Sequence, residues 1–175
     1  DICAVSFTGG TSTGAQIAKV AAPKFKKLSL ELGGKNPNII FDDCDFDKML
    51  ATTLASSFAN QGQICLCGSR IFVQRGIYEK FKTAFVEKVS NAGGYYIRPT
   101  VIEGLSYNCR TNQEEIFGPV VTIMPFDTEE EVLMMANSTE YGLAATVWTE
   151  NLTRAHRIAN DLHMGIVWIN CWLVR

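Results

Sequence analysis

The sequence has little net charge and no long apolar run, and each of these features excludes a class of protein. Its 175 residues carry 16 basic and 18 acidic side chains, which gives a formal net charge of −2. Because binding to nucleic acid or anionic lipid needs a broad basic surface, we expect neither partner. The longest apolar runs, such as Val120 to Phe126, are strand-sized and too short to span a membrane.

Histidine is scarce, which restricts metal and protease chemistry. The two histidines, His156 and His163, flank a polar helix-like segment, and neither neighbours a cysteine in the sequence. Cys65 and Cys67 have the spacing of half a zinc site, but the second half is missing, so we expect no metal. The lack of a histidine beside Cys65 also argues against a cysteine protease.

The six cysteines indicate the redox environment. An even number permits disulfides, but a chain with 47% hydrophobic residues can form a core without them. Reduced thiols and a cytoplasmic location, or an organelle matrix, are therefore favoured. The cysteines are Cys3, Cys44, Cys65, Cys67, Cys109 and Cys171.

Both ends of the sequence lie in or directly after strand-like segments. The chain begins Asp1-Ile2-Cys3-Ala4, without Met or a signal-peptide pattern, and Arg175 directly follows an apolar run. We expect that both ends belong to something longer. The length suffices for one core, with a small appended lobe.

Strand-like and helix-like segments alternate along the chain. This rhythm predicts an α/β fold, with a parallel-rich sheet and flanking helices. The predicted strands are Ala4 to Thr8, Leu28 to Leu32, Asn38 to Phe41, Arg70 to Gln74, Tyr95 to Val101, Val120 to Phe126, Leu143 to Trp148 and Ile166 to Asn170. The predicted helices run from the turn at Gly9 to about Ala22, from Asp45 to Asn60, from Ile77 to Ser90, from Thr128 to about Asn137 and from Asn151 to near Gly165.

A glycine-containing turn follows the first predicted strand. Its sequence is Gly9-Gly10-Thr11-Ser12-Thr13-Gly14, and it opens a helix, where backbone N–H groups can bind phosphate. The spacing differs from the dinucleotide fingerprint G-x-G-x-x-G. A plain tight turn is thus an equally good interpretation.

Two further runs combine glycine with a chemically useful side chain. In Glu31-Leu32-Gly33-Gly34-Lys35 a strand-terminal glutamate can face a cleft and take a proton from water. The alternative is a surface acid paired with Lys35. In Asn60-Gln61-Gly62-Gln63-Ile64-Cys65 a thiol follows a turn whose N–H groups can stabilise a thiolate. Glu31 and Cys65 are therefore a candidate base and nucleophile, with Cys67 a bystander.

A third run places two acids before a turn and an apolar strand. It reads Glu114-Glu115-Ile116-Phe117-Gly118-Pro119. One carboxylate can accept hydrogen bonds from a ribose diol, and the aromatic side chain can pack against a cofactor ring. Taken alone, the run predicts no more than a loop.

Together these runs resemble the signatures of the NAD(P)-dependent aldehyde dehydrogenase superfamily, in the family order. Tyr141-Gly142-Leu143-Ala144-Ala145 and Val167-Trp168-Ile169-Asn170-Cys171 are similar to further blocks. The details most resemble the 2-aminomuconate semialdehyde dehydrogenases, notably Ser57 to Cys67 and Asn170 to Arg175. The resemblance covers nearly the whole chain.

The resemblance implies a mechanism and a set of binding residues. The Cys65 thiolate would attack the aldehyde, and Glu31 would activate the water that hydrolyses the thioester. The implied cofactor is NAD or NADP and the partner a small-molecule aldehyde, while full-length relatives are homo-oligomeric. The binding residues implied are Gly9 and Gly10 beside the nicotinamide and phosphates, Glu115 at the ribose, Phe117 at the ring and Arg175 at a substrate carboxylate.

The chain also departs from the family pattern in three places. By comparison with full-length members, we expect that segments are missing before Ala4, near positions 89–93 and after Arg175. The implied domains are a remnant of the NAD-binding domain at 1–30 and a catalytic domain at 31–175 with an internal deletion. Because most of the NAD-binding part is missing, we expect the isolated chain to have little dehydrogenase activity. The alternatives are an inactive remnant or an NAD-independent esterase that uses Cys65.

Overall fold

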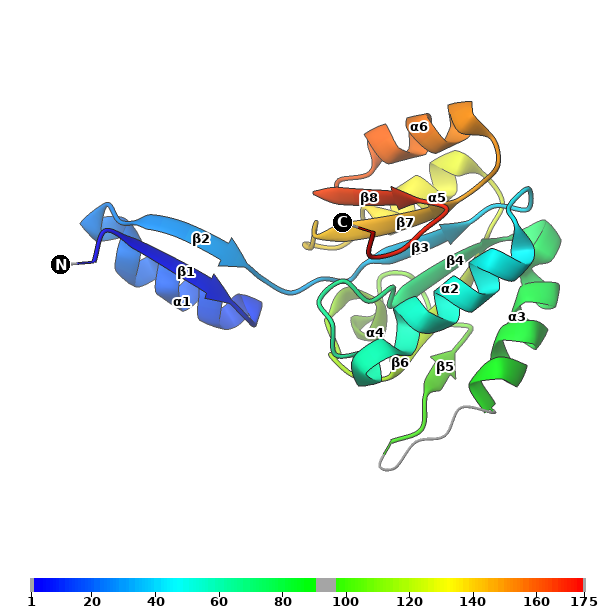
Figure 1. The fold of residues 1–175 in the computed structure, drawn as a ribbon, viewed down its shortest axis with the longest axis horizontal. Coiled ribbons are helices and arrows are strands. Elements are labelled where there is room, and N and C mark those ends of the chain that lie inside the picture. Colours follow the sequence, from blue (N-terminus) through cyan, green and yellow to red (C-terminus); the bar gives the residue numbers. More distant parts are fainter. Residues whose placement is uncertain (1, 91–96, 175) are drawn as a thin grey trace. The chain divides into compact units, whose positions relative to one another are not determined.

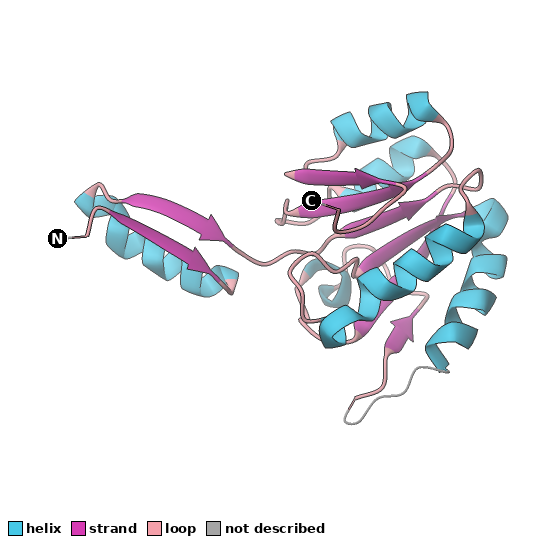
Figure 2. Ribbon diagram, viewed as in Figure 1, coloured by secondary structure: helices cyan, strands magenta, loops and turns pink. Residues whose placement is uncertain are grey.

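A computed structural model describes residues 2–90 and 97–174 and divides the chain into two compact units. One comprises Asp1–Gly33 and the other Gly34–Arg175. Figures 1 and 2 show their elements, and each unit is described by itself.

The smaller unit is one strand–helix–strand motif. It contains β1 (Ala4–Thr8), α1 (Thr11–Ala21), a 3-10 turn η1 (Ala22–Lys24) and β2 (Lys27–Glu31). The two strands pair in parallel, with Ala4 opposite Lys27 and Thr8 opposite Glu31. The glycine turn between β1 and α1 is the predicted one.

The larger unit is a parallel six-stranded sheet. Its strands lie in the order β5-β6-β4-β3-β7-β8, and every described pair is parallel. The strands are β3 (Pro37–Ile40), β4 (Arg70–Gln74), β5 (Thr100–Ile102), β6 (Val120–Phe126), β7 (Ala144–Trp148) and β8 (Ile166–Ile169). The helices are α2 (Phe46–Phe58), η2 (Ala59–Gly62), α3 (Arg75–Ser90), α4 (Arg110–Gln113), α5 (Glu129–Ala136) and α6 (Leu152–Asp161).

Helices cover both faces of this sheet, so the central strands are buried on each side (Figure 1). On one face Ile40 and Ile71 pack against α2 and α3, and on the other Ile39 and Phe72 pack against α5 and α6. Alternate residues of a strand face opposite sides, so each apolar strand serves both layers. The predicted α/β class with a parallel-rich sheet is confirmed. No described helix is long and apolar enough to cross a membrane.

Side-chain caps set three helix starts. The Asp45 carboxylate accepts from the Lys48 N–H, the Thr128 hydroxyl from the Glu131 N–H, and the side-chain Oδ1 of Asn151 from the Arg154 N–H. These contacts satisfy N–H groups that have no partner within the helix. The predicted start at Asn151 and the capping interaction at Thr128 are confirmed.

Two predicted boundaries are wrong. The last helix ends at Asp161, not near Gly165, because Asn137 accepts from the His163 N–H and donates to the Asp161 carbonyl. The predicted strand Tyr95 to Val101 begins only at Thr100 within the described residues, while its first two residues lie outside them.

Candidate active site

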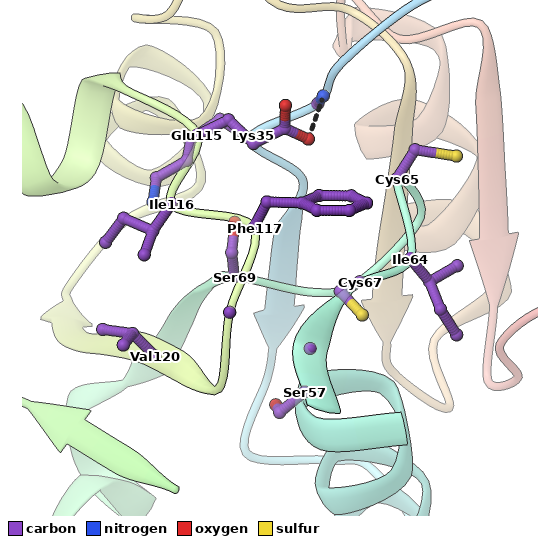
Figure 3. A pocket seen from close by; sticks show the side chains of 13 residues that line it. Lys35, Ser57, Ile64, Cys65, Cys67, Ser69, Glu115, Ile116, Phe117 and Val120 are labelled. Carbon is purple, nitrogen blue, oxygen red and sulfur yellow. Dashed lines mark hydrogen bonds between the residues drawn. The ribbon is translucent and has the colours of Figure 1, made fainter. Parts of the chain in front are cut away.

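One cavity in the larger unit is lined by the sequence motifs (Figure 3). Its walls come from Gly34 and Lys35, from positions around Cys65, and from the segment between Glu115 and Val120. The enclosed space is about 20 Å³, room for about one water-sized group. The cavity therefore joins three segments that are far apart in sequence.

The loop that carries Cys65 begins with an unusual backbone. Asn60, Gln61 and Gly62 have φ angles of 50°, 59° and 71°, which is the left-handed region. Cys65 follows in a turn and is half-buried, while Cys67 is buried. Burial raises the pKa of the Cys67 thiol, which disfavours its thiolate form.

Glu115 and Phe117 lie on the opposite wall of the cavity. One carboxylate oxygen of Glu115, Oε1, accepts a hydrogen bond of 3.1 Å from the Gly34 N–H. The Phe117 side chain is 49% exposed, and its backbone φ is 50°. Cys65, Glu115 and Phe117 thus meet at one cavity, whereas their roles stay predictions.

The other predicted site residues lie elsewhere in the chain. Glu31 ends β2 of the smaller unit, and its carbonyl oxygen accepts a hydrogen bond of 3.0 Å from the Gly9 N–H. Gly10 is the N-cap of α1, where no side chain caps the first turn. Glu31 and Cys65 belong to different units, so their pairing stays a prediction. Arg175 lies outside the described residues.

Two buried cations belong to this region, Lys35 in the cavity wall and Arg70 bonded to the Lys35 carbonyl, and the sequence did not reveal either. Lys35 is only 1% exposed, and its pKa is lowered to about 8 by burial and by the charge of Arg70, with Glu115 acting in the opposite direction. Arg70 is fully buried, and burial lowers its pKa to about 10.

The buried guanidinium of Arg70 is satisfied by three carbonyl groups. Nε donates to Lys35 O at 2.8 Å, and the two terminal nitrogens donate to Met135 O at 2.9 Å and Ala136 O at 2.8 Å. The last two carbonyls end α5, where a helix presents unpaired carbonyls and partial negative charge. Arg70 therefore connects the cavity wall to the end of a helix.

Asn36 is a further residue that sequence reasoning missed. Its side-chain amide donates to the carbonyls of both Cys65 and Cys67, at 2.7 and 2.9 Å. The signal was available in Asn36-Pro37-Asn38, because two amide side chains enter a strand that is otherwise apolar. Buried amides of this kind need hydrogen-bond partners, but the sequence does not say which ones.

Comparison with known proteins identifies the family. The aldehyde dehydrogenase family model matches residues 1–93 and 90–175, which together include the whole chain. The chain belongs to the aldehyde dehydrogenase family. The family predicted from the order of the motifs is confirmed, and with it an oxidoreductase lineage.

Several relatives of this aldehyde dehydrogenase chain are named 2-aminomuconic semialdehyde dehydrogenase. The chain is 42% identical over 229 residues to the 2-aminomuconic semialdehyde dehydrogenase of Danio rerio and 43% identical over 225 residues to that of Homo sapiens. These alignments include 100% and 98% of this chain, but 47% and 46% of the relatives. The chain thus spans about half the length of the curated relatives it matches.

Solved aldehyde dehydrogenase structures have the same fold. The betaine aldehyde dehydrogenase of Staphylococcus aureus, in complex with NAD⁺, is 35% identical with a TM-score of 0.95, over 99% of this chain and 44% of that one. An NAD⁺ complex of an aldehyde dehydrogenase from Bacillus cereus is also 35% identical, with a TM-score of 0.96, over 99% and 45%. These matches confirm the predicted fold over 99% of the chain.

Proposed function

We propose that this chain carries the thiol chemistry of an NAD-dependent dehydrogenase for a semialdehyde that bears a carboxylate. The observation that carries the proposal is the shared cavity of Cys65, Glu115 and Phe117 in a chain of this family. The relatives named 2-aminomuconic semialdehyde dehydrogenase support the substrate class. Arg175 is the proposed partner of the substrate carboxylate, because a guanidinium can bind a carboxylate with two hydrogen bonds.

Cys65 and Glu31 perform the proposed steps. The Cys65 thiolate forms a bond to the aldehyde carbon, and the carbonyl electron pair moves to oxygen, giving a thiohemiacetal whose oxyanion faces the Cys65 N–H. Conversion to a thioester removes a hydride, for which NAD supplies the acceptor when it is bound. Glu31 takes a proton from the water that attacks the thioester carbon, so the acid leaves and the thiolate returns.

The residues at the cavity fit the nicotinamide end of such a cofactor. Oε1 of Glu115 accepts from the Gly34 N–H, and no donor in residues 2–90 and 97–174 contacts the other carboxylate oxygen, which leaves that oxygen for a ribose hydroxyl. The half-exposed ring of Phe117 offers a flat apolar surface beside it. Gly9 and Gly10, at the uncapped start of α1, are proposed to approach the cofactor phosphates, and NADP is the alternative cofactor.

The proposal also includes the domain organisation, the cellular location and the oligomeric state. Residues 1–30 are the proposed remnant of the NAD-binding domain and 31–175 the catalytic domain, with an internal deletion near 89–93. The two family matches, which meet at 90–93, support that junction, as does an alignment of 229 residues for a chain of 175. The proposed location is the cytoplasm. The full-length relatives are proposed to be homo-oligomers.

A second candidate function is NAD-independent ester hydrolysis at Cys65. It is favoured by the position of the thiol and its neighbours within one unit, since acyl transfer to sulfur needs no hydride acceptor. For this chain we therefore expect little NADH formation with an aldehyde, but release of p-nitrophenolate from p-nitrophenyl acetate.

One pair of variants tests both functions. Cys65→Ala should abolish p-nitrophenolate release and any NADH formation, whereas Cys67→Ala should leave them close to those of the unsubstituted chain. Ester hydrolysis that survives Cys65→Ala would overturn the assignment of the nucleophile. NADH formation as fast as in full-length relatives would overturn the expectation that the missing segments limit the chain.

A further inference from the structure

Four consecutive carbonyl groups around Cys65 all accept hydrogen bonds. The Ile64 carbonyl accepts from the Cys67 N–H at 2.9 Å. Asn36 Nδ2 donates to the carbonyls of Cys65 and Cys67, and Trp172 Nε1 donates to the Leu66 carbonyl at 3.0 Å. Every peptide plane from position 64 to position 68 is therefore held by its oxygen.

The two side-chain donors are themselves fixed. Asn36 is 3% exposed, and its Oδ1 accepts from the Ala144 N–H of β7 at 3.2 Å. Its own carbonyl accepts from the Arg70 N–H at 3.3 Å. Trp172 packs in a small apolar cluster with Leu66 and Trp168. Because both donors are held by the sheet or by packing, they constrain the loop and do not simply follow it.

These contacts fix the carbonyl groups of the loop and leave the N–H of Cys65 available. Among the described residues, none accepts a hydrogen bond from the Cys65 N–H. That N–H lies in the peptide plane whose oxygen, on Ile64, is bound by Cys67. The thiol and the N–H of Cys65 thus sit on a backbone with a fixed orientation.

We infer that Asn36, assisted by Trp172, is a positioning residue for acyl transfer. It holds the Cys65 peptide so that the thiolate can attack a carbonyl carbon while the N–H of the same residue binds the developing oxyanion. Such a donor helps only if it is aligned before the reaction. This inference rests on the proposed role of Cys65 as a nucleophile.

The chain offers a matched control two residues along the same segment. Asn38 is 1% exposed, and its Nδ2 donates to the Thr53 hydroxyl at 2.9 Å, so it contacts α2 and not the carbonyls of the Cys65 loop. Asn36→Asp and Asn38→Asp each replace a buried amide donor by an acceptor of the same shape. Both should destabilise the fold, but only Asn36→Asp should disturb the orientation of Cys65.

The experiment compares two reactions of Cys65 in the whole chain. Acylation by p-nitrophenyl acetate passes through an oxyanion, whereas alkylation by iodoacetamide is a displacement at carbon without one. The first is measured by the burst of p-nitrophenolate and the second by mass spectrometry of the Cys65 peptide. Asn36→Asp should lower the ratio of acylation to alkylation rates by about tenfold or more, and Asn38→Asp should leave it unchanged.

Each outcome decides the inference. Partial unfolding of the variant, or a change in the exposure of Cys65, should change the acylation and alkylation rates by the same factor and leave their ratio unchanged. An unchanged ratio in Asn36→Asp would therefore overturn the inference that Asn36 positions Cys65. If Asn36→Asp does not fold, Trp172→Phe keeps the aromatic ring, removes the donor to Leu66 and should lower the same ratio, with Trp168→Phe as its control. If the unsubstituted chain is alkylated but never acylated at Cys65, the proposed function fails and the inference fails with it.

Discussion

Gly62 lies directly against the carbonyl group of Gly118, so that a side chain at position 62 would overlap the Gly118 oxygen. This contact joins two motifs that are distant in sequence, the loop before Cys65 and the turn after Phe117. The φ angle of Gly62 is also positive, at 71°. Glycine is thus required here for two independent reasons, a backbone conformation and a close approach.

Gly62→Ala separates these two reasons when it is compared with Gly104→Ala. Gly104 has a φ of 75° but no atom within 4 Å of where a Cβ would lie, so its substitution costs only the strained conformation, about 1–2 kcal/mol. Gly62→Ala adds a clash with rigid backbone and should cost more in urea denaturation. It should also slow acylation of Cys65, because the Phe117 turn must move away. Equal losses of stability in the two variants would show that the Gly118 contact is unimportant.

Arg70→Met should destabilise the chain strongly. The substitution removes three hydrogen bonds and leaves the buried carbonyls of Lys35 and Ala136 without this donor, for an expected loss of about 3 kcal/mol or more. The Met135 carbonyl keeps its hydrogen bond of 2.7 Å from the Ser138 hydroxyl. The measurement is the free energy of unfolding in urea. Arg75→Met is the control, because the Arg75–Asp127 ion pair is exposed and should matter far less. A similar effect of both variants would contradict the structural role of Arg70.

The sheet could be predicted from sequence because its central strands are short apolar runs between polar turns. Ile39 and Ile71 alternate with residues that face the opposite layer, and burial on both sides makes the pattern continuous. The helix starts were equally readable, since Asn151 and Thr128 act locally on the next turn. The end of α6 was not, because Asn137, which is distant in sequence, determines it.

The site was predictable only in part for the same physical reason. Cys65 carries recognisable chemistry in its own motif, whereas Glu115 was indicated only by the resemblance of the combined motifs to a known family. Lys35, Asn36 and Arg70 act through contacts that exist only once the strands have paired. The amides at Asn36 and Asn38 beside an apolar strand hint at burial, but the local sequence does not say which groups such a residue contacts.

The reactivity of the six free thiols should differ with burial. Burial raises the pKa of Cys44 to about 11, and burial also raises the pKa of Cys67. At mildly alkaline pH both should remain protonated and react slowly with iodoacetamide, while the exposed thiol of Cys3 reacts fast. Mass spectrometry of each peptide against time measures the rates. Rapid modification of Cys44 in the folded chain would contradict its burial.

Lys35 should make stability depend on pH in a particular direction. Its pKa is about 8 in the folded chain, against an ordinary value of 10.5, so between these values the unfolded chain binds more protons. Stability should therefore rise as the pH increases from about 8 to about 10.5, by at most about 3 kcal/mol. Lys35→Met has no ammonium to bury and should lack this rise, with a free energy of unfolding closest to that of the unsubstituted chain at the alkaline end.

Subtracting the free energies of unfolding in urea of the two proteins at each pH removes the contribution of the titrating groups that they share. Lys48→Met, at an exposed position, controls for the loss of a charge and should keep the rise of stability with pH. A difference between Lys35→Met and the unsubstituted chain that does not change with pH would contradict the burial of Lys35 as a cation.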